Sequence, residues 1–186
     1  MNEAPHFYAK DRATWREWLV DNHETEKAVW LVYDKGSERK LKWQDIVQEA
    51  LCFGWIDGRQ NVVSETQSKI YVSKRKPKGM WSKINKANVE ELIASRQMQP
   101  AGLAAVERAK LNGSWDTLNN SDNLILPSEL IDAFKENPLA RANFEAFPES
   151  SRRNALQWMY DAKTDATRQK RIKQTVESAA QNVRVR

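Results

Sequence analysis

Hydrophobic residues in the first third of the chain follow first a helical and then a strand period. In residues 11–22, Trp15, Trp18 and Leu19 recur at the spacing of one helix face, and the aspartate that opens the segment is a suitable N-cap. Residues 27–36 form a β-branched and aromatic run that ends at a glycine, which is typical of a strand. The pattern therefore predicts a helix followed by a strand.

A second helix and two further strands follow. The apolar residues of 41–54 fall on one helical stripe that ends near Gly54. The stripe consists of Trp43, Ile46, Val47, Ala50 and Leu51. Residues 55–66 and 69–76 are predicted to be strands around a short turn near Thr66–Ser68. The order helix, strand, helix, strand, strand is typical of α+β proteins rather than of a doubly wound sheet.

The remaining segments are predicted to be helical. Ser82 or Asn88 is a suitable N-cap for one helix, and a second helix runs from Pro100 to a stop at Gly113. After a polar loop, residues 127–182 are predicted to be helical throughout. Breaks are expected near Pro138, Pro148 and Thr164.

These elements predict an α+β fold in two parts. Residues 1–118 form an N-terminal module with a small antiparallel sheet and helices, and residues 124–184 form an all-helical C-terminal segment. We place four of the eight tryptophans in the N-terminal core because they follow the helix and strand periods. These are Trp15, Trp18, Trp30 and Trp43.

Composition excludes several kinds of site. One cysteine permits neither an internal disulfide nor a cysteine-cluster metal site, and the two histidines, His6 and His23, lack the spacing of a zinc pair. We therefore expect no metal and no cofactor. The N-terminal region has no apolar run of the kind found in signal peptides, and no segment is apolar enough for a membrane span. We expect a cytoplasmic protein.

The net charge of +5 is unevenly distributed. Residues 69–88 contain seven Lys or Arg and no Asp or Glu, and residues 163–186 contain seven basic and two acidic side chains. The rest of the chain is net acidic. Basic segments of this kind favour anionic partners.

Several motifs resemble the YdeI/OmpD-associated family, whose members are often described as bacteriocin-protection proteins. The motifs are ALCFGWIDG (50–58), KRKPKGMWSKINKANVEELI (74–93), QPAGLAAVERAKLNGSWD (99–116) and the helical end from NPLARANFEAF (137–147) to RIKQTVE (171–177). They cover nearly the whole chain in the same order.

The resemblance implies a small bacterial protein without an established catalytic activity, so no catalytic residues are assigned. It also implies a role in resistance to bacteriocins or cationic antimicrobial peptides, and an association with an outer-membrane porin. A chain with a pI near 9.3 repels cationic peptides. We therefore expect any protection to be indirect, through signalling or envelope stress.

The candidate ligand site lies between the GWIDG motif (54–58) and a basic loop, KRKPKGMWSKIN (74–85), which follows the last strand and precedes a helix. Cations there surround a predicted helix start, where free N–H groups and the helix dipole favour an anion. Its predicted residues are Trp55, Asp57, Arg75, Lys76, Trp81, Ser82, Lys83 and Asn85.

Two of these residues have alternative interpretations. Asp57 accepts hydrogen bonds from a ligand, or it forms part of the turn between helix and strand. Trp81 stacks on a ring of the ligand, or it packs onto the helix that it precedes. For Cys52, a buried inert thiol is favoured over a nucleophile. In the C-terminal basic helix, docking through Ile172 and Val176 is favoured over contact with nucleic acid.

The favoured function is a non-catalytic cytoplasmic binding protein whose partner is a small anionic ligand or another protein. The first alternative is a nucleic-acid-binding protein that uses residues 69–88 together with residues 163–186. The second is a small enzyme in which Asp57 is the base and Lys83 or Arg75 the electrophile.

Overall fold

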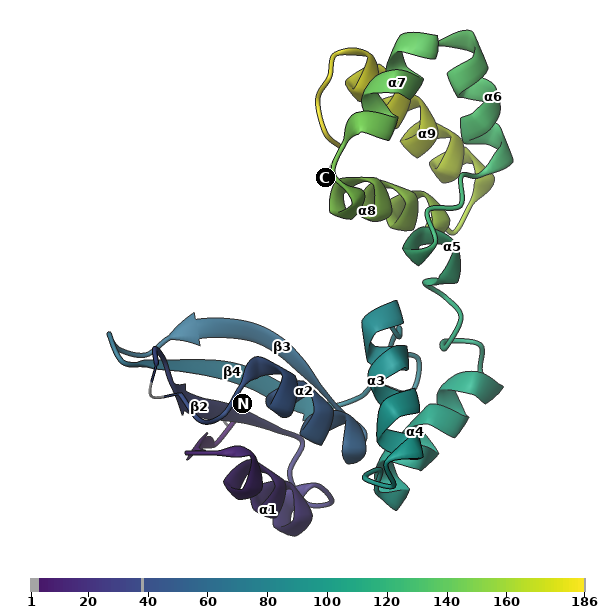
Figure 1. The fold of residues 1–186 in the computed structure, drawn as a ribbon. Helices are drawn as coiled ribbons and strands as arrows, with labels where there is room; N and C mark the ends of the chain where they lie inside the picture. The colour runs from purple at the N-terminus through teal and green to yellow at the C-terminus, as the bar shows by residue number, and fades with distance from the viewer. Residues whose placement is uncertain (1–3, 38, 186) are drawn as a thin grey trace. The chain divides into compact units, whose positions relative to one another are not determined.

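The computed structural model describes residues 4–37 and 39–185, which divide into two compact units at Asp116 and Thr117. Figure 1 labels the elements of both units. The first unit contains four strands and four helices among the described residues. In chain order they are β1 (His6–Tyr8), α1 (Arg12–Asn22), β2 (Ala28–Asp34), α2 (Trp43–Cys52), β3 (Trp55–Val62), β4 (Gln67–Lys74), α3 (Lys83–Ala94) and α4 (Pro100–Leu111).

The sheet has the strand order β1-β2-β4-β3. Strand β4 pairs antiparallel with β3, as expected for two strands around a short turn, and it also pairs antiparallel with β2. A register shift separates Asp57 from Gln60. The short strand β1 was not predicted, and it pairs parallel with β2 through Phe7 and Leu31. The α+β fold class is confirmed, with a mixed sheet in place of a wholly antiparallel one.

One core lies between the sheet and helices α1 and α2. Alternate residues of β2 and β4 enter it, among them Leu31 and Val72, and the helices contribute Trp15 and Leu19. The helix α1 begins where predicted because the Asp11 carboxylate accepts a hydrogen bond from the Thr14 N–H at 2.9 Å. Figure 1 shows α3 and α4 side by side at one end of the sheet.

The predicted tryptophan core is partly wrong. Trp15 is fully buried and Trp18 packs against the core half-buried, whereas Trp43 is 43% exposed on the first turn of α2. Trp30 is buried on the opposite face of the sheet, where its ring lies 5.2 Å from that of Tyr71. Helix period alone did not distinguish the first turn of α2 from its buried stretch.

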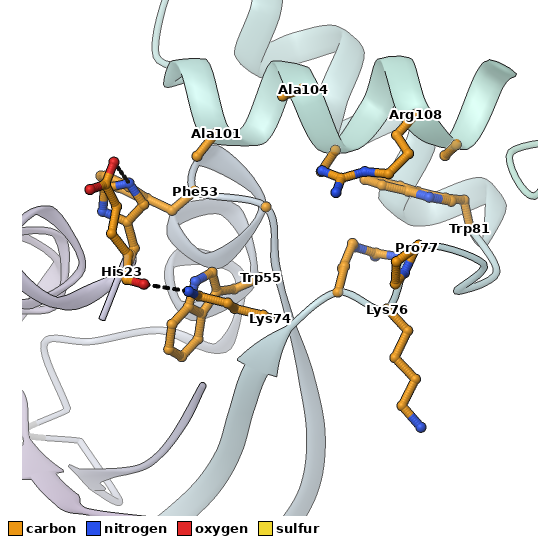
Figure 2. Close-up of a pocket in the computed structure, with 15 residues that line it drawn as sticks. His23, Phe53, Trp55, Lys74, Lys76, Pro77, Trp81, Ala101, Ala104 and Arg108 are labelled. Carbon is orange, nitrogen blue, oxygen red and sulfur yellow. Dashed lines mark hydrogen bonds and ion pairs between the residues drawn. The ribbon is translucent and has the colours of Figure 1, made fainter. Parts of the chain in front are cut away.

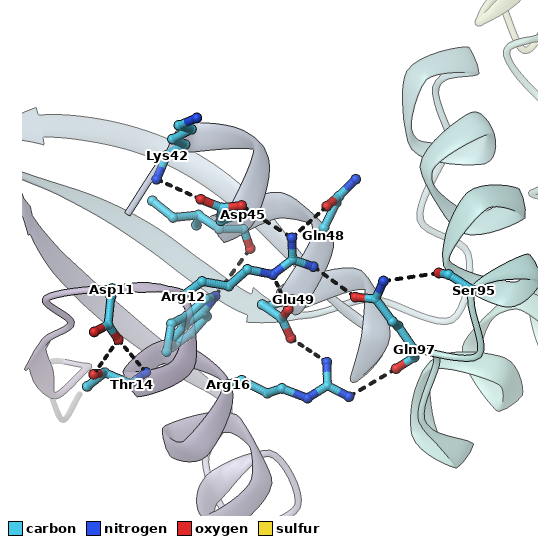
Figure 3. A network of polar contacts seen from close by, with 12 residues as sticks. Asp11, Arg12, Thr14, Arg16, Lys42, Asp45, Gln48, Glu49, Ser95 and Gln97 are labelled. Atoms are coloured by element: carbon cyan, nitrogen blue, oxygen red, sulfur yellow. Dashed lines mark hydrogen bonds and ion pairs between the residues drawn. The ribbon is translucent and has the colours of Figure 1, made fainter. Parts of the chain in front are cut away.

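A polar network joins α1, α2 and the loop before α4 (Figure 3). The carboxylate of Glu49, whose side chain is only 2% exposed, accepts hydrogen bonds at 2.6 Å from both Arg12 and Arg16. Arg12 also donates to the Gln97 side chain, and Arg16 donates to the Gln97 carbonyl. The network therefore fixes three segments around one buried negative charge.

Among the residues that the structure describes, the second unit consists of helices joined by short loops and contains no strand. Its helices are α5 (Asn119–Asp122), α6 (Ser128–Glu136), α7 (Pro138–Ala146), α8 (Glu149–Tyr160) and α9 (Asp165–Ala180). Helix α9 packs against α6, α7 and α8 around a core that includes Phe134, Phe144 and Ile172. The predicted breaks near Pro138, Pro148 and Thr164 are confirmed.

Candidate functional site

A pocket of about 320 Å³ lies in the first unit, between the start of β3, the loop after β4 and helix α4 (Figure 2). Its wall combines cationic, aromatic and small side chains. The lining residues are His23, Glu24, Phe53, Gly54, Trp55, Lys74, Arg75, Lys76, Pro77, Trp81, Ala101, Ala104, Ala105, Arg108 and Ala109.

Gly54 sets the position of two walls. Its φ of +73° ends α2, a conformation that side chains other than glycine rarely adopt. A Cβ at Gly54 would lie 2.9 Å from the Ala101 carbonyl oxygen, so the glycine also allows α4 to come close. The Arg75 N–H donates to the Gly54 carbonyl at 3.0 Å and holds the basic loop against the start of β3.

The basic loop is fixed at further points. The Asn112 side chain, just beyond α4, donates to the Pro77 carbonyl at 2.7 Å. The Gly79 N–H donates to the Lys76 carbonyl at 2.9 Å, which closes a tight turn. The loop therefore holds its side chains in place beside α4.

Arg75 is the cation most enclosed by this wall. Its guanidinium carbon lies 3.6 Å from the centre of the Trp81 ring, and its Nη1 donates to the Met80 carbonyl at 3.1 Å. The other two nitrogens, Nε and Nη2, are closed to solvent and have no hydrogen-bond partner. The fully buried Trp55 has an unpaired Nε1 in the same pocket wall. Unpaired buried donors are rare, because each costs roughly 1–3 kcal/mol.

Burial governs the electrostatics of the site. It lowers the pKa of Arg75 to about 10, and the nearby negative charge of Asp57 acts in the opposite direction. Burial likewise raises the pKa of Asp57, while a hydrogen bond from its own backbone N–H and the charge of Arg75 lower it. The two groups interact through their charges, but Asp57 does not occupy the free edge of the guanidinium.

The other cations of the pocket are engaged or exposed. Lys74 Nζ donates to the Glu24 carbonyl at 2.7 Å. Lys76 is exposed and points away from the pocket, whereas Arg108 extends from α4 toward Trp81 (Figure 2). Arg75 is therefore the cation of the pocket whose guanidinium is buried in the wall.

The structure brings half of the predicted site together. Trp55, Arg75, Lys76 and Trp81 line the pocket, and Asp57 lies beside Arg75 outside the lining. The other three predicted residues, Ser82, Lys83 and Asn85, do not line it.

Two of those three residues form a helix cap. The Ser82 hydroxyl accepts a hydrogen bond from the Asn85 N–H at 3.3 Å, which caps α3. Trp81 is only 2% exposed, so its ring offers no open face to a ligand and packs instead with Trp115 and Arg75.

The basic stretch does not form one surface. Strand alternation directs Lys69 toward Trp30 on the other face of the sheet, 4.7 Å from its ring centre. Lys86 lies 3.9 Å from Asp116. The seven cations of residues 69–88 therefore have different surroundings.

In the C-terminal basic segment, the favoured docking interpretation fits the structure. Ile172 is buried in the core of the second unit, and Val176 packs against that core. Two cations of α9 are paired, Arg168 with Glu129 and Lys173 with Glu177. Arg186 lies outside the described residues.

Helix α4 contributes residues that the sequence analysis did not select. Ala101, Ala104, Ala105 and Ala109 recur at helical spacing and form the small-residue wall. This stripe of alanines in PAGLAAVERA was the signal that could have identified the wall. Cys52 is buried, and burial raises the pKa of its thiol, which fits an inert side chain.

Within the described ranges, no group of three or more His, Cys, Asp or Glu side chains is arranged to hold a metal ion. None of the helices in these ranges has the length and apolar character needed to cross a lipid bilayer.

The structure thus defines an α+β protein with a partly open pocket in its first unit, whose wall contains unpaired donors, and a helical second unit. Residues 7–105, more than half of the chain, match the family model for a domain of unknown function, DUF8412, and the chain belongs to that family. Residues 123–182 match the model described as bacteriocin-protection, YdeI or OmpD-associated. No curated protein and no solved structure matches the chain.

The resemblance to the YdeI/OmpD-associated family is confirmed in the C-terminal region. The motifs from residues 50–58 and 74–93 instead lie within the region that matches the domain of unknown function. The resemblance to this family was expected over nearly the whole chain, but the family model matches residues 123–182.

Proposed function

We propose that this protein binds a small anionic ligand in the pocket between the basic loop and α4, without catalysing a reaction. The observation that carries the proposal is the free edge of Arg75, formed by its Nε and Nη2. Those two N–H groups are parallel donors, the geometry that pairs with two oxygens of one anion. A ligand that accepts from them offsets the cost of burying the guanidinium.

Both nitrogens are closed to solvent in this conformation. An anion therefore reaches them only after a side chain of the pocket wall moves. Trp81 contacts Arg75 and is buried in the same wall, so such a movement changes the surroundings of an indole. Tryptophan fluorescence consequently reports on binding.

We place this binding role in the cytoplasm and link it to resistance against bacteriocins or cationic antimicrobial peptides. The link to resistance is supported by the description of the family model that matches residues 123–182, which names bacteriocin protection. Because the chain is basic, the link runs through ligand sensing and envelope stress rather than through capture of cationic peptides.

The test is a titration of the full chain with acetate, inorganic phosphate, nucleotides and short DNA at two salt concentrations. Arg75→Met removes the charge and keeps an apolar chain over Trp81. Lys78→Met removes an exposed cation of the same loop that does not line the pocket, so it is the matched control. We expect wild type and Lys78→Met to bind a small anion and Arg75→Met to bind at least tenfold more weakly.

Two results would overturn the proposal. One is that wild type binds none of these anions, and the other is that Arg75→Met binds them as well as wild type does. If short DNA binds far better than every small anion, with an affinity that falls steeply as salt rises, the nucleic-acid alternative replaces the proposal.

A further inference from the structure

We infer that the ligand is a small carboxylic acid with an apolar body, bound through its carboxylate to the free edge of Arg75. This inference rests on the proposed function and narrows it from anions in general to one chemical class. Charge, donor geometry and the shape of the opposite wall each support it.

The charges around the pocket favour a ligand that carries a single negative charge. One buried guanidinium offers the unpaired donors, and Asp57 already supplies a neighbouring negative charge. Glu24 also lines the pocket, but its side chain is 86% exposed, so water and salt screen its charge. A phosphate dianion would bring a second charge without a buried partner, which is costly beside a guanidinium edge that is closed to solvent. A carboxylate carries one charge and matches one guanidinium.

The flanking cations do not change this balance. Lys74 is held by the Glu24 carbonyl, and Lys76 points away from the pocket (Figure 2). Arg108 is exposed, so water and salt screen its charge. The buried edge of Arg75 therefore favours a monoanion.

The donors match the two oxygens of a carboxylate. Nε–H and Nη2–H on one edge of Arg75 pair with both oxygens in a bidentate arrangement. The Trp55 Nε1–H is a third unpaired donor of the same pocket, and it carries no charge. An acidic group with few oxygens satisfies these donors.

The opposite wall suits an apolar body. It is formed by Phe53 and by the four alanines of α4, which are Ala101, Ala104, Ala105 and Ala109. Because alanine side chains end at Cβ, they leave room that longer side chains would fill. A volume of about 320 Å³ is at the lower end for small-molecule pockets. At about 30 Å³ for a water-sized group, it holds roughly ten non-hydrogen atoms.

The first test is a series of probes with the full-length protein. Affinity is measured for acetate, butyrate, hexanoate and phenylacetate, with phenylacetamide as the neutral counterpart and phenyl phosphate as the dianion. We expect affinity to rise about three- to fourfold for each added methylene until the pocket is filled. Phenylacetate should bind at least tenfold more tightly than phenylacetamide and more tightly than phenyl phosphate.

Three variants test where on the protein the carboxylic acid binds. Ala104→Leu extends an exposed alanine of the wall and should weaken hexanoate binding at least tenfold. Ala94→Leu makes the same change at an exposed position of α3 outside the pocket and should leave binding unchanged. Arg75→Lys keeps the charge but removes the parallel donors, so it should weaken carboxylate binding.

The outcomes separate the two proposals. The inference of a carboxylic acid is wrong if phosphates bind best, if affinity does not depend on chain length, or if phenylacetamide binds as tightly as phenylacetate. The proposal of anion binding would still stand after any of these results. If Ala104→Leu binds hexanoate as wild type does, the carboxylate binds elsewhere and the inference fails. If no anion binds, both proposals fail.

Discussion

Among the arginines that the structure describes, Arg75 has two buried nitrogens without a hydrogen-bond partner, both on one edge of its guanidinium, whereas Arg39, Arg152 and Arg168 each have one. Arg12 and Arg16 are each about one-third exposed and bind the Glu49 carboxylate. Arg75 instead packs its face on Trp81 and satisfies one nitrogen with a backbone carbonyl. Cation–π contact compensates part of the burial cost, at roughly 2 kcal/mol when desolvated. The remaining cost is what an anionic ligand would relieve.

Asp57 gives a pH-dependent prediction. Its pKa is raised in the folded protein, mainly by burial, so the folded state holds the proton more tightly than the unfolded state does. Its contribution to stability is therefore greatest at low pH and falls as pH rises from about 4, the usual value of the unfolded chain, through the raised pKa. The wild-type advantage over Asp57→Asn in the free energy of unfolding should decrease over this range and then remain constant.

Urea unfolding of wild type and Asp57→Asn at pH values from 3 upward, on the order of half-unit steps across the carboxyl range, measures this difference. Subtracting the two curves removes the carboxylates common to both proteins. A difference that increases with pH would mean that attraction to Arg75 outweighs burial, contrary to the prediction.

At the residue scale, the sequence identified Arg75 and its neighbours but not the feature that makes the site. The absence of acidic residues in 69–88 drew attention to the loop, and four predicted residues do line the pocket. Lys69 contacts Trp30 on the face of β4 away from the core, whereas Arg75 lies in the loop after that strand, and helix capping uses Ser82. Which nitrogens remain unpaired depends on contacts with Met80 and Trp81 in three dimensions, which spacing in the sequence does not specify.

At the scale of elements, the buried Glu49 holds α1 against α2. Glu49→Gln keeps the side-chain shape but removes the charge that both arginines share. We expect a loss of about 2–4 kcal/mol in the free energy of unfolding, toward the lower end because the arginines are partly exposed. Urea denaturation of the full chain measures it.

Glu17→Gln is the matched control, since Glu17 is an exposed residue of α1. Its effect should stay within about 0.5 kcal/mol. Equal unfolding midpoints for Glu49→Gln and wild type would show that the network contributes little net stability.

Gly102 determines how closely α4 approaches α2. A Cβ at this position would lie 2.2 Å from the Cys52 carbonyl oxygen and 2.7 Å from that of Leu51. Alanine is favoured over glycine within a helix by about 1 kcal/mol, but this overlap forces α4 to shift. We expect Gly102→Ala to lose at least about 2 kcal/mol of stability and to weaken anion binding, because α4 forms a wall of the pocket.

Gly58→Ala provides the comparison, because its Cβ would meet the Tyr71 carbonyl oxygen at the milder distance of 3.3 Å. This variant should lose less than about 1 kcal/mol in the same thermal or urea unfolding assay. If Gly102→Ala were as stable as Gly58→Ala, the close approach of α4 would not limit stability.

Elements with strong local signals were predictable from the sequence. Asp11, Ser82 and Thr164 cap helices as their side chains allow, and Pro100 opens α4. Strand β1 has only three residues, and its pairing with β2 comes from tertiary contact rather than from a local period.

At the scale of the whole molecule, the described residues form two hydrophobic cores that share no residue. The first surrounds Trp15 and Trp55 and ends with residues of α4, and the second surrounds Phe134 and Met159. Chains shorter than roughly 40 residues usually need disulfides, metals or oligomerisation to fold. Both units are longer than this. The two family models likewise end and begin on either side of the division, at residues 105 and 123.

We therefore predict that each unit folds without the other. Separate chains of residues 1–116 and 117–186 should each show helical circular dichroism and a cooperative thermal transition, because each retains its complete core. The anion site should stay with residues 1–116, since every residue of the pocket belongs to that unit. An equal mixture of the two fragments is the control for stabilisation between units. If residues 1–116 were unfolded alone but folded on mixing, the two cores would depend on each other, and the prediction that each unit folds without the other would be wrong.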